Sequence, residues 1–282
     1  MLTIQSCKEM QAWAQKTREA GKIIAFVPTM GFLHKGHLAL MEEGKKRGDV
    51  LVISIFVNPT QFGVGEDYEE YPRDLEGDKK KAEKVGVDVI FAPSVKEMYP
   101  PDYQTFVQVE KVTQNLCGIS RPTHFRGVTT VVAKLFNIVK PQIAIFGEKD
   151  YQQLITIRQM VKDLNFDIEI VGMPIVREDD GLAMSSRNNY LTPKERKAAL
   201  CLVNSLNQAE KLFQNGEVRT EKLIQEAEKI INAQPLAKID YIKICHPETL
   251  EDIDTIDSKA LMALAVRIGN TRLIDNRILK RF

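Results

Sequence analysis

Apolar runs alternate with helix-like segments through the first two-thirds of the chain. Short and almost wholly apolar runs predict buried strands at residues 22–27, 50–57, 87–91, 142–146 and 168–176. Apolar spacing and charge patterns predict helices at residues 36–47, 74–85, 127–139 and 150–164. Apolar strands that alternate with helices are typical of a parallel sheet covered on both faces. We therefore expect an α/β domain with a Rossmann-like parallel sheet over residues 1–176.

The pattern changes after residue 176. Thr192, Pro193 and Glu195 form a strong helix start, because threonine can cap, proline suits the first helical position and glutamate completes a capping box. Two amphipathic helices follow, the first ending near residue 215 and the second covering residues 223–231. Strand-like runs then occupy residues 238–244, 260–266 and 271–274. We expect a smaller α+β C-terminal lid domain over residues 177–282.

Three polar loops follow predicted strands of the first domain, at residues 28–36, 58–65 and 147–150. Ligands of open parallel sheets bind beyond the carboxyl ends of the strands. We therefore expect these loops, which come from separate parts of the chain, to meet over one edge of the sheet.

The first loop contains His34-Lys35-Gly36-His37 at the start of a predicted helix. A helix N-terminus offers free N–H groups and favours phosphate, and an imidazole can stabilise charge on a leaving pyrophosphate. Two of the four histidines in the chain lie here. The alternative is a pair of surface histidines beside a turn. A zinc site is disfavoured, because no third ligand accompanies the pair.

The other loops carry groups that suit the same site. Asn58 and Gln61 offer uncharged donors and acceptors for a substrate with hydroxyls, although an ordinary Asn-Pro turn also explains that loop. Lys149 can neutralise phosphate, or it is simply solvated. Arg187 lies in a polar stretch that is either a phosphate-binding loop or a plain linker. Residues 184–188 and 63–72 are candidate lids.

Composition narrows the class of partner. Among 282 residues, 39 basic side chains face 38 acidic ones, and a net charge of +1 gives no bulk attraction to nucleic acid or to an anionic membrane. No apolar window reaches the roughly 18 residues of a membrane span, and the N-terminus lacks a signal-peptide pattern. The four scattered cysteines look like reduced thiols, so we expect a cytoplasmic protein.

The histidine loop resembles the His-x-Gly-His signature of the nucleotidyltransferase superfamily. Residues 184–187, Met-Ser-Ser-Arg, resemble the second signature of that superfamily, the Lys-Met-Ser-Lys-Ser loop. Ala183 and Ser186 stand where that signature has lysines, so Lys149 and Arg187 are expected to supply the missing positive charge. Two rival interpretations remain: a plain nucleotidyltransferase, and an RNA-binding protein with a synthetase-like fold, against which the near-neutral charge argues.

Five motifs in order, at residues 28–37, 56–62, 121–127, 147–154 and 184–188, together resemble the pantoate–β-alanine ligase family. The likeness runs nearly end to end and is weakest after about residue 191. It implies an ATP-dependent ligase that condenses pantoate with β-alanine to give pantothenate, AMP and pyrophosphate through a pantoyl adenylate. It also implies Mg²⁺ with ATP and a homodimer.

The resemblance assigns roles residue by residue. His37 is the principal catalytic residue, with His34 and Lys149. Gln61 and Gln153, together with Asn58, bind pantoate and β-alanine. The residues implied to bind ATP are Met30, Gly31, Phe32, Leu33, His34, Lys35, Gly36, His37, Gly147, Glu148, Lys149, Asp150, Val176, Met184, Ser185, Ser186 and Arg187. The metal ligands stay open, with Asp74, Asp78 and Asp150 as candidates.

Overall fold

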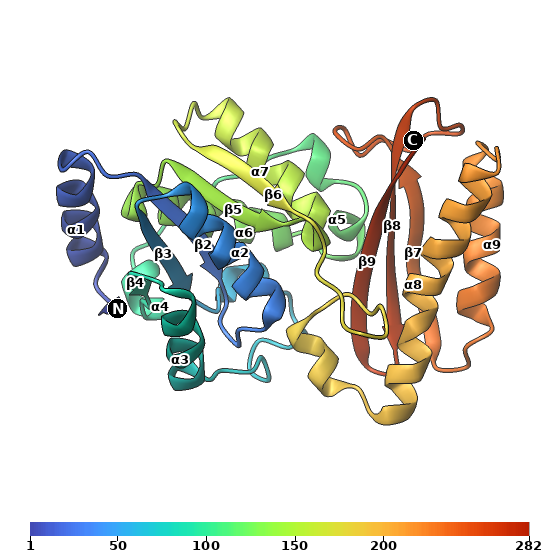
Figure 1. Cartoon of the computed structure of the whole chain (residues 1–282), viewed down its shortest axis with the longest axis horizontal. Helices are drawn as coiled ribbons and strands as arrows, with labels where there is room; N and C mark the ends of the chain where they lie inside the picture. Colours follow the sequence, from blue (N-terminus) through green and yellow to red (C-terminus); the bar gives the residue numbers. More distant parts are fainter. Residues whose placement is uncertain (282) are drawn as a thin grey trace.

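The structure, a computed structural model, describes residues 1–281 and contains two β-sheets (Figure 1). The first sheet has six parallel strands in the order β1–β4–β3–β2–β5–β6. They are β1 Leu2–Ile4, β2 Ile24–Thr29, β3 Val50–Ile55, β4 Val89–Phe91, β5 Ile143–Gly147 and β6 Glu169–Met173. Because β2, β3 and β5 are neighbours, the loops that follow them lie side by side at the carboxyl edge.

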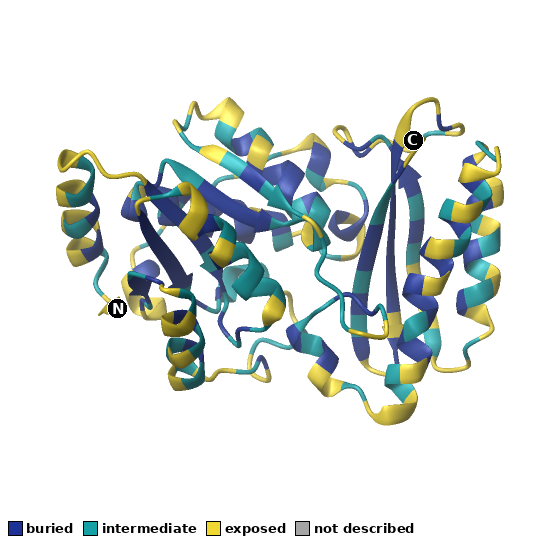
Figure 2. Cartoon of the chain, viewed as in Figure 1, coloured by how far each residue is buried: buried dark blue, intermediate teal, exposed yellow. Residues whose placement is uncertain are grey.

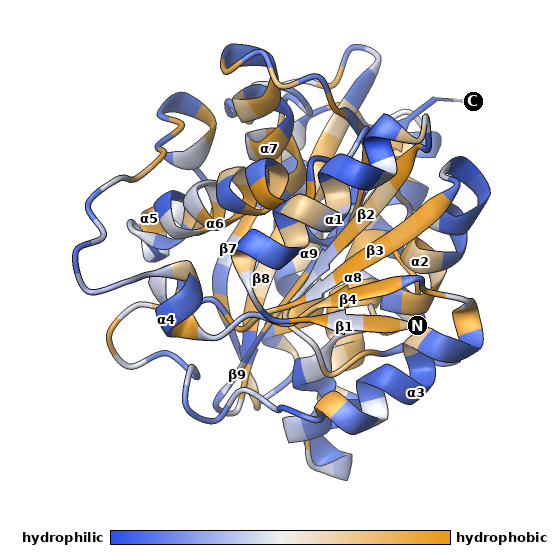
Figure 3. Cartoon of the chain, turned by 90° about the vertical axis from the view of Figure 1, so that its left-hand side faces the viewer, coloured by the Kyte–Doolittle hydropathy of each residue, from blue (hydrophilic) through white to orange (hydrophobic). Residues whose placement is uncertain are grey.

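Helices cover both faces of this sheet. Successive strand side chains point to opposite faces, so Phe26 packs with α1, α6 and α7 while Val27 packs with α2 and α3. The sheet is therefore buried and apolar (Figures 2 and 3). The helices are α1 Cys7–Glu19, α2 Lys35–Arg47, α3 Leu75–Val85, α4 Val95–Met98, α5 Cys117–Ser120, α6 His124–Val139 and α7 Tyr151–Asp163, with 3-10 turns at Pro59–Gln61, Lys111–Thr113, Glu148–Asp150 and Ser186–Tyr190.

The second sheet is antiparallel and has three strands, β7 Ala237–Cys245, β8 Lys259–Ile268 and β9 Thr271–Lys280. Helices α8 Pro193–Gln214 and α9 Thr220–Asn232 cover one of its faces with an apolar core. The opposite face is turned toward the parallel-sheet part of the molecule (Figure 1) and shares a small cluster with it, in which Leu261 and Ala263 join Val112, Leu116 and Ile155. The second sheet thus forms a wall beside the first.

The expected fold class is confirmed, with a Rossmann-like parallel sheet followed by a smaller α+β part. The capping box at Thr192 and Glu195 begins α8 as predicted. The sequence pattern did not predict β1, a three-residue edge strand, or α1, which buries only Met10 and Ala14. Strand β6 ends at Met173 rather than at residue 176. Among residues 1–281, no helix combines the length and apolar character needed to cross a bilayer.

Candidate active site

The loops after β2, β3 and β5 meet around a cavity of about 240 Å³, as the sheet order requires. The segment after β6 closes it, because Val176 and residues 184–187 reach the same space. The structure therefore brings together most of the predicted site residues, namely Met30, His34, Gly36, His37, Asn58, Gln61, Gly147, Lys149, Asp150, Gln153, Val176, Met184, Ser185, Ser186 and Arg187.

A buried carboxylate shapes the histidine loop. Asp78, on α3, is 1% exposed and accepts the main-chain N–H groups of Phe32 and Leu33, both at 2.7 Å. Gly31 has φ of +82°, and a Cβ there would lie 2.9 Å from Cγ2 of Ile55. Phe32 also has positive φ, at +50°. The loop is thus held in an unusual conformation by α3 and β3.

The two histidines of this loop are joined to each other. The main-chain N–H of His34 donates to Nδ1 of His37 at 3.3 Å, and the rings stack with centroids 3.9 Å apart. Burial, and then His34 and Lys149, hold the pKa of His37 well below its usual value. Burial, followed by Lys149, lowers the pKa of His34 to about 4. Both rings are therefore neutral near pH 7, and the proton of His37 is on Nε2.

The second loop is organised by Asn58. This side chain is 1% exposed, and its Nδ2 donates at 3.1 Å to both Oε1 of Gln61 and the carbonyl oxygen of Gly127. Its Oδ1 accepts from the Tyr99 hydroxyl at 2.9 Å and from Thr60. Since protein groups occupy the Asn58 amide, its effect on the cavity is to orient Gln61.

Two functional candidates had no role in the sequence prediction, Arg121 and His124. Nδ1 of His124 lies 2.9 Å from the carbonyl oxygen of Gln61, and Nη2 of Arg121 donates to the same oxygen at 3.2 Å. Burial, then Arg121, lowers the pKa of His124 to about 4. A signal was present in the sequence, since three of the four histidines line this cavity and the third lies in the motif at residues 121–127.

The cationic side chains of the site are already partnered by carboxylates. Arg187 forms a two-point ion pair with Asp67, at 2.9 and 2.8 Å, and Arg121 forms another with Glu66, at 2.6 Å for both contacts. Nζ of Lys149 lies 3.8 Å from Asp150. Consecutive carboxylates of the 63–72 segment therefore hold two arginines of the site, one of them in the 184–188 segment.

Five residues of the predicted ATP set do not line the cavity: Gly31, Phe32, Leu33, Lys35 and Glu148. Leu33 is buried in the apolar core that covers one face of the sheet, and Lys35 is exposed. The main-chain oxygens of Glu148 and Lys149 both accept from Nδ2 of Asn276, at 2.9 Å. These positions belong to the loops around the cavity without lining it.

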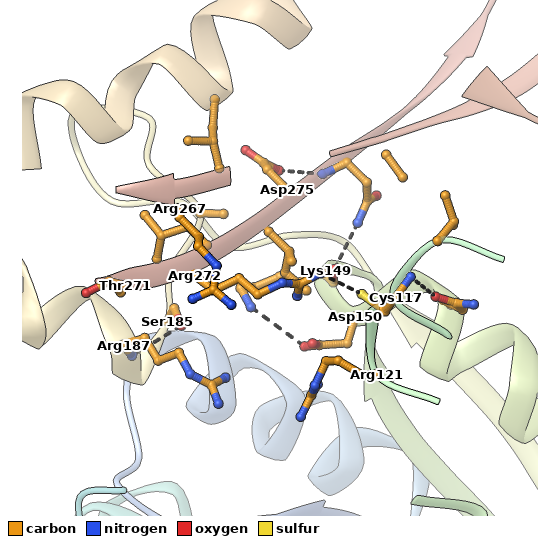
Figure 4. Close-up of a pocket in the computed structure, with 18 of the residues that line it drawn as sticks. Cys117, Arg121, Lys149, Asp150, Ser185, Arg187, Arg267, Thr271, Arg272 and Asp275 are labelled. Atoms are coloured by element: carbon orange, nitrogen blue, oxygen red, sulfur yellow. Dashed lines mark hydrogen bonds and ion pairs between the residues drawn. The ribbon is translucent and has the colours of Figure 1, made fainter. Parts of the chain in front are cut away.

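A second and larger cavity, of about 570 Å³, adjoins the first. The two share Arg121, His124, Lys149, Asp150, Gln153, Ser185 and Arg187. Its other wall comes from β8 and β9 of the antiparallel sheet, from which Arg267 and Arg272 extend toward Lys149 and Asp150 (Figure 4). The antiparallel sheet thus reaches the same space as the loops of the parallel sheet.

The candidate metal ligands differ in availability. Asp74 caps α3 by accepting from the N–H of Gly77 at 2.9 Å, and Asp78 is occupied by the histidine loop. Asp150 lines both cavities and is half exposed. No group of three or more potential ligands gathers anywhere within residues 1–281.

Comparisons with known proteins cover almost the whole chain. A family model described as pantoate-beta-alanine ligase matches residues 2–278. The chain is 60% identical over 279 residues to pantothenate synthetase of Geotalea uraniireducens, with 99% of each chain covered. The crystal structure of pantothenate synthetase from Thermus thermophilus is 46% identical, with a TM-score of 0.95 and complete coverage of both chains.

A third relative was crystallised with ligands. Pantoate-beta-alanine ligase from Francisella tularensis, complexed with beta-gamma ATP and beta-alanine, is 35% identical and has a TM-score of 0.82. The match covers 99% of this chain and 97% of that one. The likeness therefore extends over both sheets and over the loops between them.

Proposed function

The chain belongs to the pantoate-beta-alanine ligase family and is an enzyme of this type, and we propose that it works through a pantoyl adenylate. The pantoate carboxylate attacks the α-phosphate of ATP, and pyrophosphate leaves. The amine of β-alanine then attacks the activated carbonyl, and AMP leaves. A free carboxylate is a poor acyl donor because it would have to expel oxide, so the adenylate supplies the leaving group.

The observation that carries this proposal is the pair of neutral, stacked histidines facing Lys149 and Arg187 around one cavity. Neutral imidazoles donate hydrogen bonds to phosphate oxygens, while the two cations offset the charge that develops on the leaving pyrophosphate. We assign His37 to the α-phosphate region, with Nε2–H as the donor. Nδ1 of His34 is buried and has no protein partner within residues 1–281.

Gln61 and Gln153 are assigned to pantoate. Both line the cavity, and their amides carry donors and acceptors without charge, which suits hydroxyl groups. Asn58 orients Gln61 from behind, and Arg121 and His124 hold the Gln61 main chain. The Francisella relative was complexed with β-alanine, and we place β-alanine in this chain beside Gln61.

The carboxylate of Asp150 is a suitable ligand for the Mg²⁺ ion that would accompany ATP. Magnesium is usually held by one or two carboxylates together with substrate phosphates and water. Asp150 offers a half-exposed carboxylate at the cavity, next to Lys149. When bound, the ion would supply positive charge beside the phosphates.

We propose the division into residues 1–176 and 177–282 because the core beneath α8 and α9 draws its buried residues from Leu182 to Leu279. A homodimer and a cytoplasmic location are proposed from the family resemblance. Sedimentation equilibrium of the purified chain measures the oligomeric state directly, and a monomer at micromolar concentration would contradict the dimer.

The reaction is tested by measuring AMP. We expect AMP and pantothenate only when ATP, pantoate and β-alanine are all present. Pyrophosphate release with a phosphorylated acceptor, and none with pantoate, would instead support a plain nucleotidyltransferase. Positional isotope exchange in ATP with pantoate alone tests the adenylate, because exchange requires reversible formation of that intermediate.

A further inference from the structure

A row of three cations crosses the antiparallel sheet. Arg267 on β8 is paired directly with Lys238 on β7 and with Arg272 on β9. Directly opposite residues of an antiparallel pair project on the same face, with Cα atoms about 5 Å apart. Like charges in this arrangement destabilise a sheet. The row therefore costs stability, and one carboxylate, Asp240, offsets it through an ion pair with Arg272 at 2.7 Å.

The hairpin that joins β8 to β9 fixes this arrangement. Ile268 pairs with Thr271, so the connection is the two-residue turn Gly269-Asn270, in which Gly269 has φ of +56°. A tight turn sets the register of both strands. The two arginines next to the turn are thus held opposite each other, and neither can move to the α8 and α9 face without shifting the whole core.

Two of the three cations of the row face the larger cavity. Arg267 and Arg272 line it, and Arg267 is exposed and has no ion-pair partner within residues 1–281. Arg272 is held by Asp240 and donates to Sγ of Cys117 at 3.5 Å. Figure 4 shows both arginines extending from the strands into the space that Lys149, Asp150 and Arg187 enter from the other side. Cations from both sheets therefore face one volume of about 570 Å³.

We propose that Arg267 and Arg272 form a diphosphate-binding wall of this cavity. The guanidinium of Arg267 can meet a phosphate at two points, and Nη1 of Arg272, which has no protein acceptor within residues 1–281, adds a second cationic donor beside it. Two adjacent cations of this kind suit two linked phosphates better than a single carboxylate. This inference rests on the proposed adenylation, which releases pyrophosphate beside Lys149 and Arg187. The wall takes a diphosphate either as the terminal phosphates of ATP or as free pyrophosphate.

The test is calorimetric binding of inorganic pyrophosphate, and separately of a non-hydrolysable ATP analogue, to the full chain. Arg267→Gln is the informative variant, because this side chain is exposed and contributes no protein ion pair within residues 1–281. We expect its pyrophosphate affinity to fall about tenfold, in line with loss of a charge-assisted contact. An equal loss for the ATP analogue identifies the terminal phosphates of ATP as the ligand, and a loss for pyrophosphate alone identifies the released product.

Lys259→Gln is the matched control. Lys259 lies on the same strand and the same face, is paired opposite Lys280, and is eight residues, or roughly 27 Å, from Arg267. Unchanged affinity for both ligands in Arg267→Gln, or an equal loss in Lys259→Gln, would overturn the proposal. Because binding is measured on unreacted protein, this outcome is separable from failure of the ligase reaction, which would show as absence of AMP in the wild-type chain.

Discussion

The main-chain N–H of His34 donates to Nδ1 of His37, so the N-cap residue of α2 fixes the tautomer of the residue one turn later. The neutral ring of His37 then carries its proton on Nε2. Burial keeps the ring uncharged, because the pKa of His37 lies well below its usual value. In the proposed reaction His37 is accordingly a hydrogen-bond donor to phosphate rather than an acid that gives up a proton.

Replacing His37 by alanine tests this role. We expect His37→Ala to lower the rate of adenylation by about 10² or more, because an oriented donor to the developing charge is lost. Rapid-quench measurement of the first turnover reports that step. His246→Ala is the control, since His246 lies outside both cavities. A near-normal burst in His37→Ala would refute the assignment.

Acid should weaken the fold through the buried histidines. The pKa values of His34 and His124 are both lowered to about 4 by burial, from an ordinary value of 6.5. Between about pH 4 and pH 6.5 these two rings bind protons in the unfolded chain but stay neutral in the folded chain. The stability contributed by keeping these rings neutral is therefore present above about pH 6.5 and is lost as the pH falls toward 4, at up to about 1.4 kcal/mol per pH unit for each ring.

Urea unfolding at pH 7.0, 5.5 and 4.5 measures this loss. We expect His34→Gln to reduce the fall in the free energy of unfolding across that range, since glutamine takes up no proton. His246→Gln, at the histidine that lies outside both cavities, is the control. An identical pH dependence in His34→Gln and wild type would contradict the assignment.

Sequence patterns predicted the parallel sheet well, because its central strands are buried on both faces and read as continuous apolar runs. They underestimated β9, which continues to Lys280 although the predicted strand ended at residue 274. The apolar run is broken by Asp275 and Asn276, which are buried yet satisfied. Asp275 pairs with Arg177, and Asn276 donates to the carbonyl oxygens of Glu148 and Lys149. These partners lie far from Asp275 and Asn276 in the sequence, so a local pattern does not predict that the two polar residues belong to a strand.

Partners that are distant in sequence also limit how much of the candidate active site could be predicted. The loops of the parallel sheet were predictable, since the carboxyl ends of neighbouring strands share one edge. Two-point ion pairs join Asp67 to Arg187 and Glu66 to Arg121. They connect segments of the chain that no local sequence pattern links. The cationic row on the antiparallel sheet depends on strand register, and the short turn after Ile268 is a local determinant of the β8–β9 register alone.

Asp78 provides a test of how the histidine loop is held. In Asp78→Ala the N–H groups of Phe32 and Leu33 lose their acceptor, and we expect a loss of about 2 kcal/mol or more in the free energy of unfolding, together with a higher KM for ATP. Asp74→Ala is the control. It removes the N-cap of the same helix, costs about 1 kcal/mol, and should leave the KM for ATP unchanged. Equal KM values in both variants would show that Asp78 serves stability alone.

Replacing Gln153 tests whether this residue binds pantoate rather than ATP, the two ligands of the first step. Its amide reaches the cavity from α7, whereas the phosphates are assigned to the histidines and the cations. We expect Gln153→Ala to weaken pantoate binding about 3- to 10-fold, the size of an uncharged hydrogen bond, and to change ATP binding less. Calorimetry with pantoate and with a non-hydrolysable ATP analogue measures both affinities. Gln159→Ala on the same helix is the control, because Gln159 bonds to Asp163 on the exposed side. Equal losses for both ligands in Gln153→Ala would remove Gln153 from the pantoate site.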